Sequence, residues 1–314
     1  MKSFSENRLV SVVISCYNYG DYLRLALKSV LAQTYSNVEV IVVNDGSTDN
    51  TEEVAKSFEN KLRLTYIPQV NQGHAHAKNT GIRNAHGDFV AFLDADDLWA
   101  PDKLSKQLAC FNKPEVGVVY CRMKFIGPQG EDRFVDLGTR HLDPRRGQVS
   151  EALFFDNFVP FSSAVVRKEV FSKIGLMDEN VKMGNDWDFW LRASVDFEFD
   201  YVDEELLLYR IGHAGQMSKN QEERQRCSDL IMSKFLKTHP GVVSLSSLKS
   251  ALVYTYTNRA LYYRDRDLKR STSFLLSAIK TRPGHLFLYK GLARNFLNWL
   301  SRRGQTQHAS SLRP

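Results

Sequence analysis

Short apolar runs alternate with helical patterns along the first half of the chain. Runs rich in β-branched residues predict buried strands, and apolar residues at helical spacing predict the helices between them. The expected strands are 9–14, 38–43, 62–67 and 89–93, and the expected helices are 22–31, 51–58 and 75–85. Strands that alternate with helices form parallel sheets covered on both faces. We therefore expect an α/β fold with a single, mostly parallel sheet flanked by helices.

The pattern changes after Pro101 and again near residue 219. Mixed elements come first, with helices expected at 102–111 and 185–193 and strands at 116–120, 161–166 and 206–209. From residue 219 onward only helical patterns remain, at 230–236, 251–263, 273–279 and 286–300. We therefore expect a domain boundary near Ser218, between an α/β domain over residues 1–218 and an α-helical region over residues 219–314.

The net charge of the chain changes sign at the same boundary, near Ser218. The formal net charge of the 314 residues is +6. Residues 1–218 hold 24 Lys or Arg and 31 Asp or Glu, a net of −7, whereas residues 219–314 hold 18 and 5, a net of +13. With 43% hydrophobic and 25% charged residues, the composition excludes collagen-like, disordered and disulfide-rich classes. An acidic body thus carries a basic tail.

The cysteines and the hydropathy of the chain indicate in which cell compartment the protein is expected. The four cysteines are far apart, with no CxxC pair and no Cys/His cluster at zinc spacing, so we expect reduced, structural thiols. No stretch approaches the roughly 20 apolar residues of a membrane span, and the start MKSFSENRLV lacks a signal-peptide core. These features predict a cytoplasmic protein.

Polar residues follow three of the expected strands at the point where each strand ends. These segments read SCYN at 15–18, NDGS at 44–47 and DADD at 94–97. Ligands of open parallel sheets bind outside the carboxyl ends of the strands. We therefore expect the functional site at this edge of the sheet.

The acidic segment is the first candidate for chemistry. Asp94, Asp96 and Asp97 lie within four residues, and a bound divalent cation would offset their mutual repulsion. Oxygen ligands favour Mg²⁺ or Mn²⁺, and Mg²⁺ is usually held by one or two carboxylates plus substrate phosphates. On the trio alone, an acidic helix start with Asp97 as N-cap is an equally good interpretation.

The neighbouring strand end favours a ligand site over a simple helix start. Asp45 follows the strand 38–43 directly, where it would accept hydrogen bonds from a base or ribose, and Gly46 allows a tight turn. A simple turn is the alternative interpretation for Asp45. For Asp49 the capping of the next helix is the better interpretation.

Several of these segments together resemble family-2 glycosyltransferases. The resemblance lies in VSVVISCYN, IVVNDGSTDNT and NQGHAHAKNTGIRNAHGDFVAFLDADDLWAPDKL, and it covers roughly residues 8–215. Asn44 replaces a frequent aspartate of the family, and Lys78 replaces a common arginine. The resemblance implies the nucleotide-sugar-binding GT-A fold, with a Rossmann-like nucleotide half and an acceptor half.

The same resemblance assigns roles to residues at the strand ends. It implies that Ser15, Tyr17 and Asp45 contact the nucleotide, with Asp45 reading a uracil. It implies that Asp94 reaches the ribose or the metal. Asp96 is then the principal ligand of Mn²⁺ or Mg²⁺. Such a cation stabilises the negative charge that develops on a nucleoside diphosphate leaving group.

The general base is expected in the segment GNDWDFW. Inverting transfer needs a carboxylate that takes the proton of the acceptor hydroxyl. The family pattern is Glu-Asp before an aromatic-rich helix, with its second residue as the base. Asp186 fills that position, and Asn185 replaces the glutamate. For Asp188 we favour a solvent-facing or Arg192-paired carboxylate.

Five further residues carry expectations of their own. Lys78 either adds positive charge to the nucleotide site or is a solvated surface lysine. Trp187 is placed to stack on a sugar ring, whereas Trp190 is expected in the core. In the loop YRIGHAG, Arg210 is a candidate for phosphate contact and His213 for contact with the metal or the diphosphate, although Gly212 is inserted relative to the family pattern.

The basic tail has three interpretations. It packs as helices with solvated charges, it contacts an anionic membrane surface, or it binds nucleic acid. No recognised nucleic-acid module is present, so we exclude nucleic acid. Helix 286–300 has an apolar face with lysine and arginine around it. We favour helical packing with peripheral contact at the inner face of the membrane, and a homo-oligomer remains open.

Two functional hypotheses follow. The first is an inverting, metal-dependent glycosyltransferase that moves a sugar from a nucleotide sugar, a UDP-sugar above all, to a glycan or lipid-linked acceptor in cell-envelope polysaccharide synthesis. The second is a non-catalytic nucleotide-sugar or glycan-binding protein on the same fold, which Asn185 and the altered His213 loop suggest.

Overall fold

Two compact units make up the chain. The computed structural model describes residues 8–135, 143–213, 215–216 and 220–310, and only the backbone of residues 301–310. The first unit consists of Met1–Leu153 and Asn157–Val242, and the second of Phe154–Asp156 and Val243–Pro314. The units thus divide later than Ser218, which itself lies outside the described residues. The domain boundary expected near Ser218 stays a prediction.

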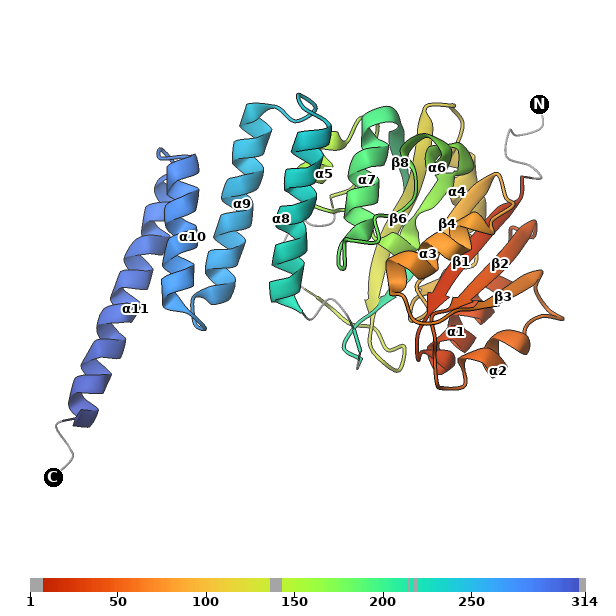
Figure 1. The fold of residues 1–314 in the computed structure, drawn as a ribbon, viewed down its shortest axis with the longest axis horizontal. Coiled ribbons are helices and arrows are strands. Elements are labelled where there is room, and N and C mark those ends of the chain that lie inside the picture. The colour runs from red at the N-terminus through yellow and green to blue at the C-terminus, as the bar shows by residue number, and fades with distance from the viewer. Residues whose placement is uncertain (1–7, 136–142, 214, 217–219, 311–314) are drawn as a thin grey trace. The chain divides into compact units, whose positions relative to one another are not determined.

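A mixed sheet forms the centre of the first unit. Its strands are β1 (Val10–Cys16), β2 (Val38–Asn44), β3 (Leu64–Pro68), β4 (Phe89–Phe92), β5 (Leu98–Trp99), β6 (Val116–Ile126), β7 (Val165–Arg167) and β8 (Glu198–Arg210). Within the described residues they form one eight-stranded sheet in the order β3-β2-β1-β4-β7-β6-β8-β5 (Figure 1). Strands β1 to β4 are parallel, and so are β6 and β8. The predicted α/β fold is confirmed.

The antiparallel members of the sheet are what the pattern did not predict. Strand β7 is antiparallel to β4 and β6, and β5 is antiparallel to β8. Both strands are very short, three and two residues, so neither contains a full alternation of apolar and polar positions. Their pairing depends on tertiary contacts rather than on local sequence.

Helices cover both faces of this sheet. The helices before Val243 are α1 (Gly20–Leu31), α2 (Thr51–Lys56), α3 (His74–Arg83), α4 (Lys103–Cys110), α5 (Ser150–Phe155), α6 (Lys168–Ile174), α7 (Asn185–Asp196) and α8 (Gln221–Thr238), with a 3₁₀ turn at Phe161–Ser163. Val10, Val12 and Ile14 of β1 share one core with side chains of α1, α2 and α4. Since side chains of a strand alternate, Val13 points to the opposite face, toward Gly81 of α3.

The face that carries α3 is also covered by α6 and α7. Phe92 of β4 packs against Phe171 of α6 and Trp190 of α7 at ring-centroid distances of 6.2 and 6.4 Å. Trp190 is fully buried, as predicted. Helix α7 begins near the carboxyl ends of the parallel strands, so this packing fixes the position of its first turn relative to them.

The second unit is helical. Its helices are α9 (Leu245–Tyr263), α10 (Leu268–Thr281) and α11 (Leu286–Ser310), which confirms the three predicted helices there. Ser244 and Asp267 cap α9 and α10 by accepting the backbone N–H groups of Ser247 and Arg270. Among the described residues, no helix is sufficiently long and apolar to cross a membrane.

Close packing of α3 on β1 generates a stability prediction. A Cβ atom at Gly81 would lie 2.3 Å from Val13 Cγ1. We expect Gly81→Ala to lower the free energy of unfolding by about 1–3 kcal/mol, because overpacking outweighs the better helix propensity of alanine. Urea denaturation followed by circular dichroism measures this. Thr80→Ala on the same helix is the control, and an equally stable Gly81→Ala would contradict the packing.

Candidate active site

Three strand ends gather at one edge of the sheet, as the sequence predicts. The register pairs Cys16 of β1 with Asn44 of β2, and Val13 of β1 with Phe92 of β4. The loops beyond β1 and β2 are bonded to each other. The Asn18 N–H donates to Ser47 Oγ at 2.9 Å, and the Thr48 N–H donates to Asn18 Oδ1 at 2.8 Å.

Asp45 is buried at this edge of the sheet, and its carboxylate is held by hydrogen bonds within the chain. It is 4% exposed. Its Oδ1 accepts hydrogen bonds from Gln69 Nε2 at 2.8 Å and the Gln72 N–H at 2.9 Å, and its Oδ2 accepts the Gly73 N–H at 2.9 Å. The carboxylate therefore fixes the loop that leads into α3. Near it, Ser15 is half-buried and Tyr17 is 50% exposed.

Asp97 is a structural member of the acidic trio. Its side chain is buried, its Oδ2 accepts the Ser162 hydroxyl at 2.6 Å, and its Oδ1 accepts the Arg210 N–H at 2.9 Å. Desolvation, together with Asp96 and Asp94, raises its pKa well above the usual range. The N-cap interpretation of Asp97 is wrong, because Leu98–Trp99 forms β5 and α4 begins only at Lys103.

Arg210 holds the backbone of the site. Its guanidinium is 1% exposed. Its Nε donates to the Asp96 carbonyl at 2.8 Å, and its Nη1 donates to the carbonyls of Gly127 and Pro128 at 2.9 and 3.0 Å. The expectation of a phosphate contact is therefore wrong for Arg210, because this buried cation is used to orient the chain around Asp96.

Asp96 and His213 lie side by side in the site. Asp96 Oδ2 and His213 Nε2 are 2.9 Å apart, and the imidazole is buried. The rings of Tyr19 and Tyr22, from the start of α1, lie 5.4 and 5.2 Å from the imidazole. The inserted Gly212 has φ +87°, a conformation that side chains disfavour, and this turn brings His213 inward.

Lys78 is buried beside Asp94. Its ammonium lies 3.7 Å from Asp94 Oδ1 and 3.5 Å from the ring centroid of Phe161, and the residue is 5% exposed. The alternative of a solvated surface lysine is therefore wrong. Desolvation raises the pKa of Asp94, Lys78 opposes this, and Asp96 and Asp186 add to the increase. The charge of Asp186 thus acts on the acidic strand end.

Asp186 lies in the first turn of α7. Gly184, with φ +77°, precedes the helix, and Asn157 Nδ2 donates to Asp186 Oδ2 at 3.0 Å. The His74 imidazole fixes the approach to this turn, with Nε2 2.8 Å from the Lys182 carbonyl. Burial, with Lys78 next, lowers the pKa of His74 to about 4, so a neutral imidazole donates this bond.

The other residues of this segment are anchored. Asp188 is buried, pairing with Arg192 at 2.9 Å and with Lys234 of α8 at 2.7 Å. The Arg192 partner is confirmed and the solvent-facing alternative is wrong. The Trp187 indole N–H donates to the Leu153 carbonyl at 2.6 Å, which fixes the edge of a ring that is only partly buried.

The ligand chemistry at Asp96 fits a divalent cation. No group of three or more His, Cys, Asp or Glu side chains within the described ranges is arranged to hold a metal ion by itself. Asp96 and His213 nevertheless bring one carboxylate oxygen and one imidazole nitrogen together. Mg²⁺ and Mn²⁺ accept such ligands and complete their coordination with water and substrate phosphates.

Several residues of the site were not predicted. Ser162 joins two acidic residues, because its hydroxyl also accepts the Asp94 N–H at 3.0 Å, and Asn157 contacts Asp186. Both arrive from a distant part of the chain, so no spacing signals them. Helical spacing did not mark Tyr19 and Tyr22 as a pair either, because Tyr19 precedes α1 as its N-cap residue.

Ser162 provides the stability test of this site. Ser162→Ala removes the two bonds that the hydroxyl makes to Asp97 and Asp94. Buried polar groups are then left unsatisfied, so we expect the free energy of unfolding to fall by about 2–4 kcal/mol. Chemical denaturation measures it. Ser163→Ala, which loses only a bond to the Pro160 carbonyl, is the control with an expected loss of about 1 kcal/mol. Equal losses would contradict the bridging role of Ser162.

Comparisons with known proteins identify the family of the chain. The family profile described as "Glycosyl transferase family 2" matches residues 11–175. An uncharacterized glycosyltransferase of Rickettsia typhi is 32% identical over 239 residues, which span 76% of this chain and 74% of that protein.

Two solved structures are similar in fold. S. aureus TarS 1–349 in complex with UDP-GlcNAc has a TM-score of 0.60 at 18% identity, over 94% of this chain and 92% of that one. The mannosyltransferase PcManGT from Pyrobaculum calidifontis, in complex with GDP-Man and Mn²⁺, has a TM-score of 0.66 at 20% identity, over 96% and 84%. On its sequence match and its GT-A fold, this chain belongs to glycosyl transferase family 2.

Proposed function

We propose that this chain is an inverting, metal-dependent glycosyltransferase that moves a sugar from a UDP-sugar to an acceptor hydroxyl, with Asp186 as the general base. The observation that carries the proposal is the position of Asp186. It stands in the first turn of α7, and its charge contributes to the raised pKa of Asp94 at the end of β4. A sugar held at the acidic strand end would lie between these two carboxylates.

The nucleotide would bind over the ends of β1 and β2. The exposed ring of Tyr17 and the half-buried Ser15 border this region, and Asp45 would read the uracil through Oδ2, which has a single hydrogen-bond partner. Support for a nucleotide-sugar donor comes from TarS and PcManGT, solved with UDP-GlcNAc and GDP-Man. Lys78 would offset the charge of Asp94 and of the phosphates.

Asp96 and His213 would hold the Mn²⁺ or Mg²⁺ ion, with Asp94 near it. The bound cation supplies positive charge that stabilises the nucleoside diphosphate as it leaves. GT-A glycosyltransferases commonly use such an ion, and PcManGT was solved with Mn²⁺. Because Tyr19 and Tyr22 surround the imidazole, His213 is held in one orientation toward Asp96.

The reaction is a single displacement. The acceptor oxygen attacks the anomeric carbon and forms the new glycosidic bond, while the bond to the diphosphate breaks and its electron pair leaves with the nucleotide. Asp186 takes the acceptor's proton. Asn157 donates to Oδ2 of Asp186, which leaves Oδ1 for that proton. Trp187, fixed through its indole N–H, would present its ring to a sugar.

The acceptor would be a glycan or a lipid-linked saccharide of the cell envelope. Residues 127–156 are expected to help form its site, although 136–142 lie outside the described residues. Peripheral contact with an anionic membrane at the cytoplasmic face, and assembly into a homo-oligomer, complete the proposal for its setting.

A non-catalytic nucleotide-sugar-binding protein is the second candidate. The observation that favours it is Asn185, which replaces the family glutamate next to the base. Its side chain is fully buried, 3.2 Å from His74 Nε2, and its Oδ1 has no hydrogen-bond partner among the described residues. Tight UDP binding without turnover of any nucleotide sugar, in the presence of Mn²⁺ and a broad panel of acceptors, would favour this candidate.

The base assignment predicts a rate effect. We expect Asp186→Asn to lower kcat by about 10²–10⁴-fold, because an amide cannot accept the proton, with little change in UDP affinity. Released UDP measures turnover, and calorimetry measures binding. Asp196→Asn, at the far end of the same helix, is the control with expected activity near the parent's. Undiminished turnover by Asp186→Asn would exclude it as the base.

The proposed metal ligands predict that turnover depends on Mn²⁺ and that loss of Asp96 weakens the response to Mn²⁺. Chelation with EDTA should abolish turnover, and Mn²⁺ should restore it in the parent. In Asp96→Asn we expect the Mn²⁺ needed for half-maximal activity to rise at least about tenfold, since a charged ligand is lost. Asp102→Asn, an exposed residue at the start of α4, should respond to Mn²⁺ like the parent. Full activity in EDTA would contradict metal dependence.

A further inference from the structure

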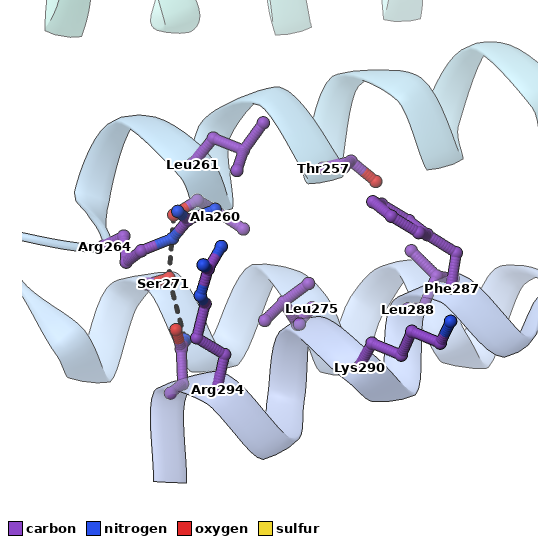
Figure 2. A pocket seen from close by; sticks show the side chains of 12 residues that line it. Thr257, Ala260, Leu261, Arg264, Ser271, Leu275, Phe287, Leu288, Lys290 and Arg294 are labelled. Carbon is purple, nitrogen blue, oxygen red and sulfur yellow. Dashed lines mark hydrogen bonds between the residues drawn. The ribbon is translucent and has the colours of Figure 1, made fainter. Parts of the chain in front are cut away.

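The second unit contains a pocket that glycosyl transfer does not explain. It has a volume of about 320 Å³ and lies among α9, α10 and α11 (Figure 2). That volume is at the lower end of the range for small-molecule sites. Its middle is apolar, with Leu275 of α10 and Leu288 of α11 lining it, and Phe287 stands at one end.

The cations of this pocket have no acidic partner. Arg264, Lys290 and Arg294 line it, and no Asp or Glu is among the lining residues. Within the described part of the chain, none of these three side chains makes an ion pair. Figure 2 shows Arg264 and Arg294 at the same end of the pocket, opposite Phe287. Two unpaired guanidinium groups beside an apolar wall favour an anion attached to an apolar body.

The floor at the arginine end is rigid. Ser271 and Asn295 are buried there, and Asn295 Nδ2 donates to Ser271 Oγ at 2.9 Å, while the serine hydroxyl donates to the Ala260 carbonyl at 2.7 Å. These bonds tie all three helices together. Gly291 allows the close approach of α11 to α10, since a Cβ there would lie 3.1 Å from Leu275. The pocket is therefore preformed rather than a gap between loosely packed helices.

The surface near the pocket identifies the kind of ligand. Residues 243–300 hold ten Lys or Arg and two Asp or Glu. Helix α11 also leaves large apolar side chains exposed: Leu286, Phe287, Phe296, Leu297 and Leu300. Exposed apolar groups among cations are typical of helices that lie in a membrane interface. A soluble anion would make no use of them.

We propose that this pocket binds the head of an anionic phospholipid, with the phosphate against Arg264 and Arg294 and the glycerol and upper acyl carbons along Leu275 and Leu288. The second unit thereby recognises a lipid head group in one defined pocket, rather than attracting anionic lipids through its overall positive charge. This inference does not rest on the proposed transfer reaction, because none of its residues is placed in the active site.

The test compares two double variants of the full chain in vesicle co-sedimentation. The parent should bind phosphatidylcholine vesicles that contain phosphatidylglycerol at least about tenfold more tightly than pure phosphatidylcholine. Arg264→Gln with Arg294→Gln should lose at least about tenfold of that affinity. Lys249→Gln with Lys280→Gln removes the same charge from exposed positions outside the pocket and should lose less than about threefold. Equal losses in the two doubles, or no preference for the anionic lipid, would overturn the proposal.

A soluble probe separates a lipid from a free phosphate. Calorimetry with dihexanoyl-phosphatidylglycerol below its micelle concentration should detect binding to the parent and to the lysine double variant but not to the arginine double variant. Inorganic phosphate should bind none of them. Phosphate binding as tight as that of the short lipid, or no binding of the short lipid, would refute the lipid site. UDP release by all three proteins should stay equal, which keeps this test distinct from that of the active site.

Discussion

The electrostatic repulsion at the end of β4 is the constraint on which the rest of the site depends. Asp94, Asp96 and Asp97 crowd one strand end, where burial and the neighbouring carboxylates raise the pKa values of Asp94 and Asp97. The surrounding residues treat these carboxylates in two different ways. Hydrogen-bond donors and a buried lysine contact Asp97 and Asp94, whereas the partner that the described residues show for the Asp96 carboxylate is the His213 imidazole. Asp96 is therefore the carboxylate of this group that we propose as the cation ligand.

The frame around this site is built from distant segments. Ser162 lies in a 3₁₀ turn between α5 and β7, and Arg210 ends β8, yet both bond to the end of β4. The short strand β7 directly follows the turn that carries Ser162, and the short strand β5 pairs with β8 near Arg210. The pairing of these two strands holds both segments at the edge where the parallel strands end. The half of the sheet that contains the antiparallel strands β7 and β5 therefore positions these segments, and the half formed by β1 to β4 presents the strand ends that a nucleotide would meet. Stability and function share the same hydrogen bonds here.

The sequence predicted the local features and missed the tertiary ones. Apolar periodicity located the parallel strands and most helices, and the polar strand ends marked the correct edge of the sheet. The burial of Lys78, the anchoring of Arg210 and the structural role of Asp97 could not be predicted, because each depends on Phe161, Gly127 or Ser162 from another part of the chain. The pairing of His213 with Asp96 was not predicted, since no spacing joins residues so far apart. The resemblance implied only that Asp96 binds the metal and that His213 contacts the metal or the diphosphate.

We propose above all that a divalent cation binds at Asp96 and His213, at the edge where the strand-end carboxylates gather. Anomalous diffraction from crystals grown with Mn²⁺ and UDP tests it most directly, because it locates the ion without assuming a mechanism. We expect one strong manganese peak in contact with Asp96 and His213, adjoining the UDP phosphates. A UDP-bound crystal with no manganese at Asp96, or with the ion held elsewhere, would contradict it.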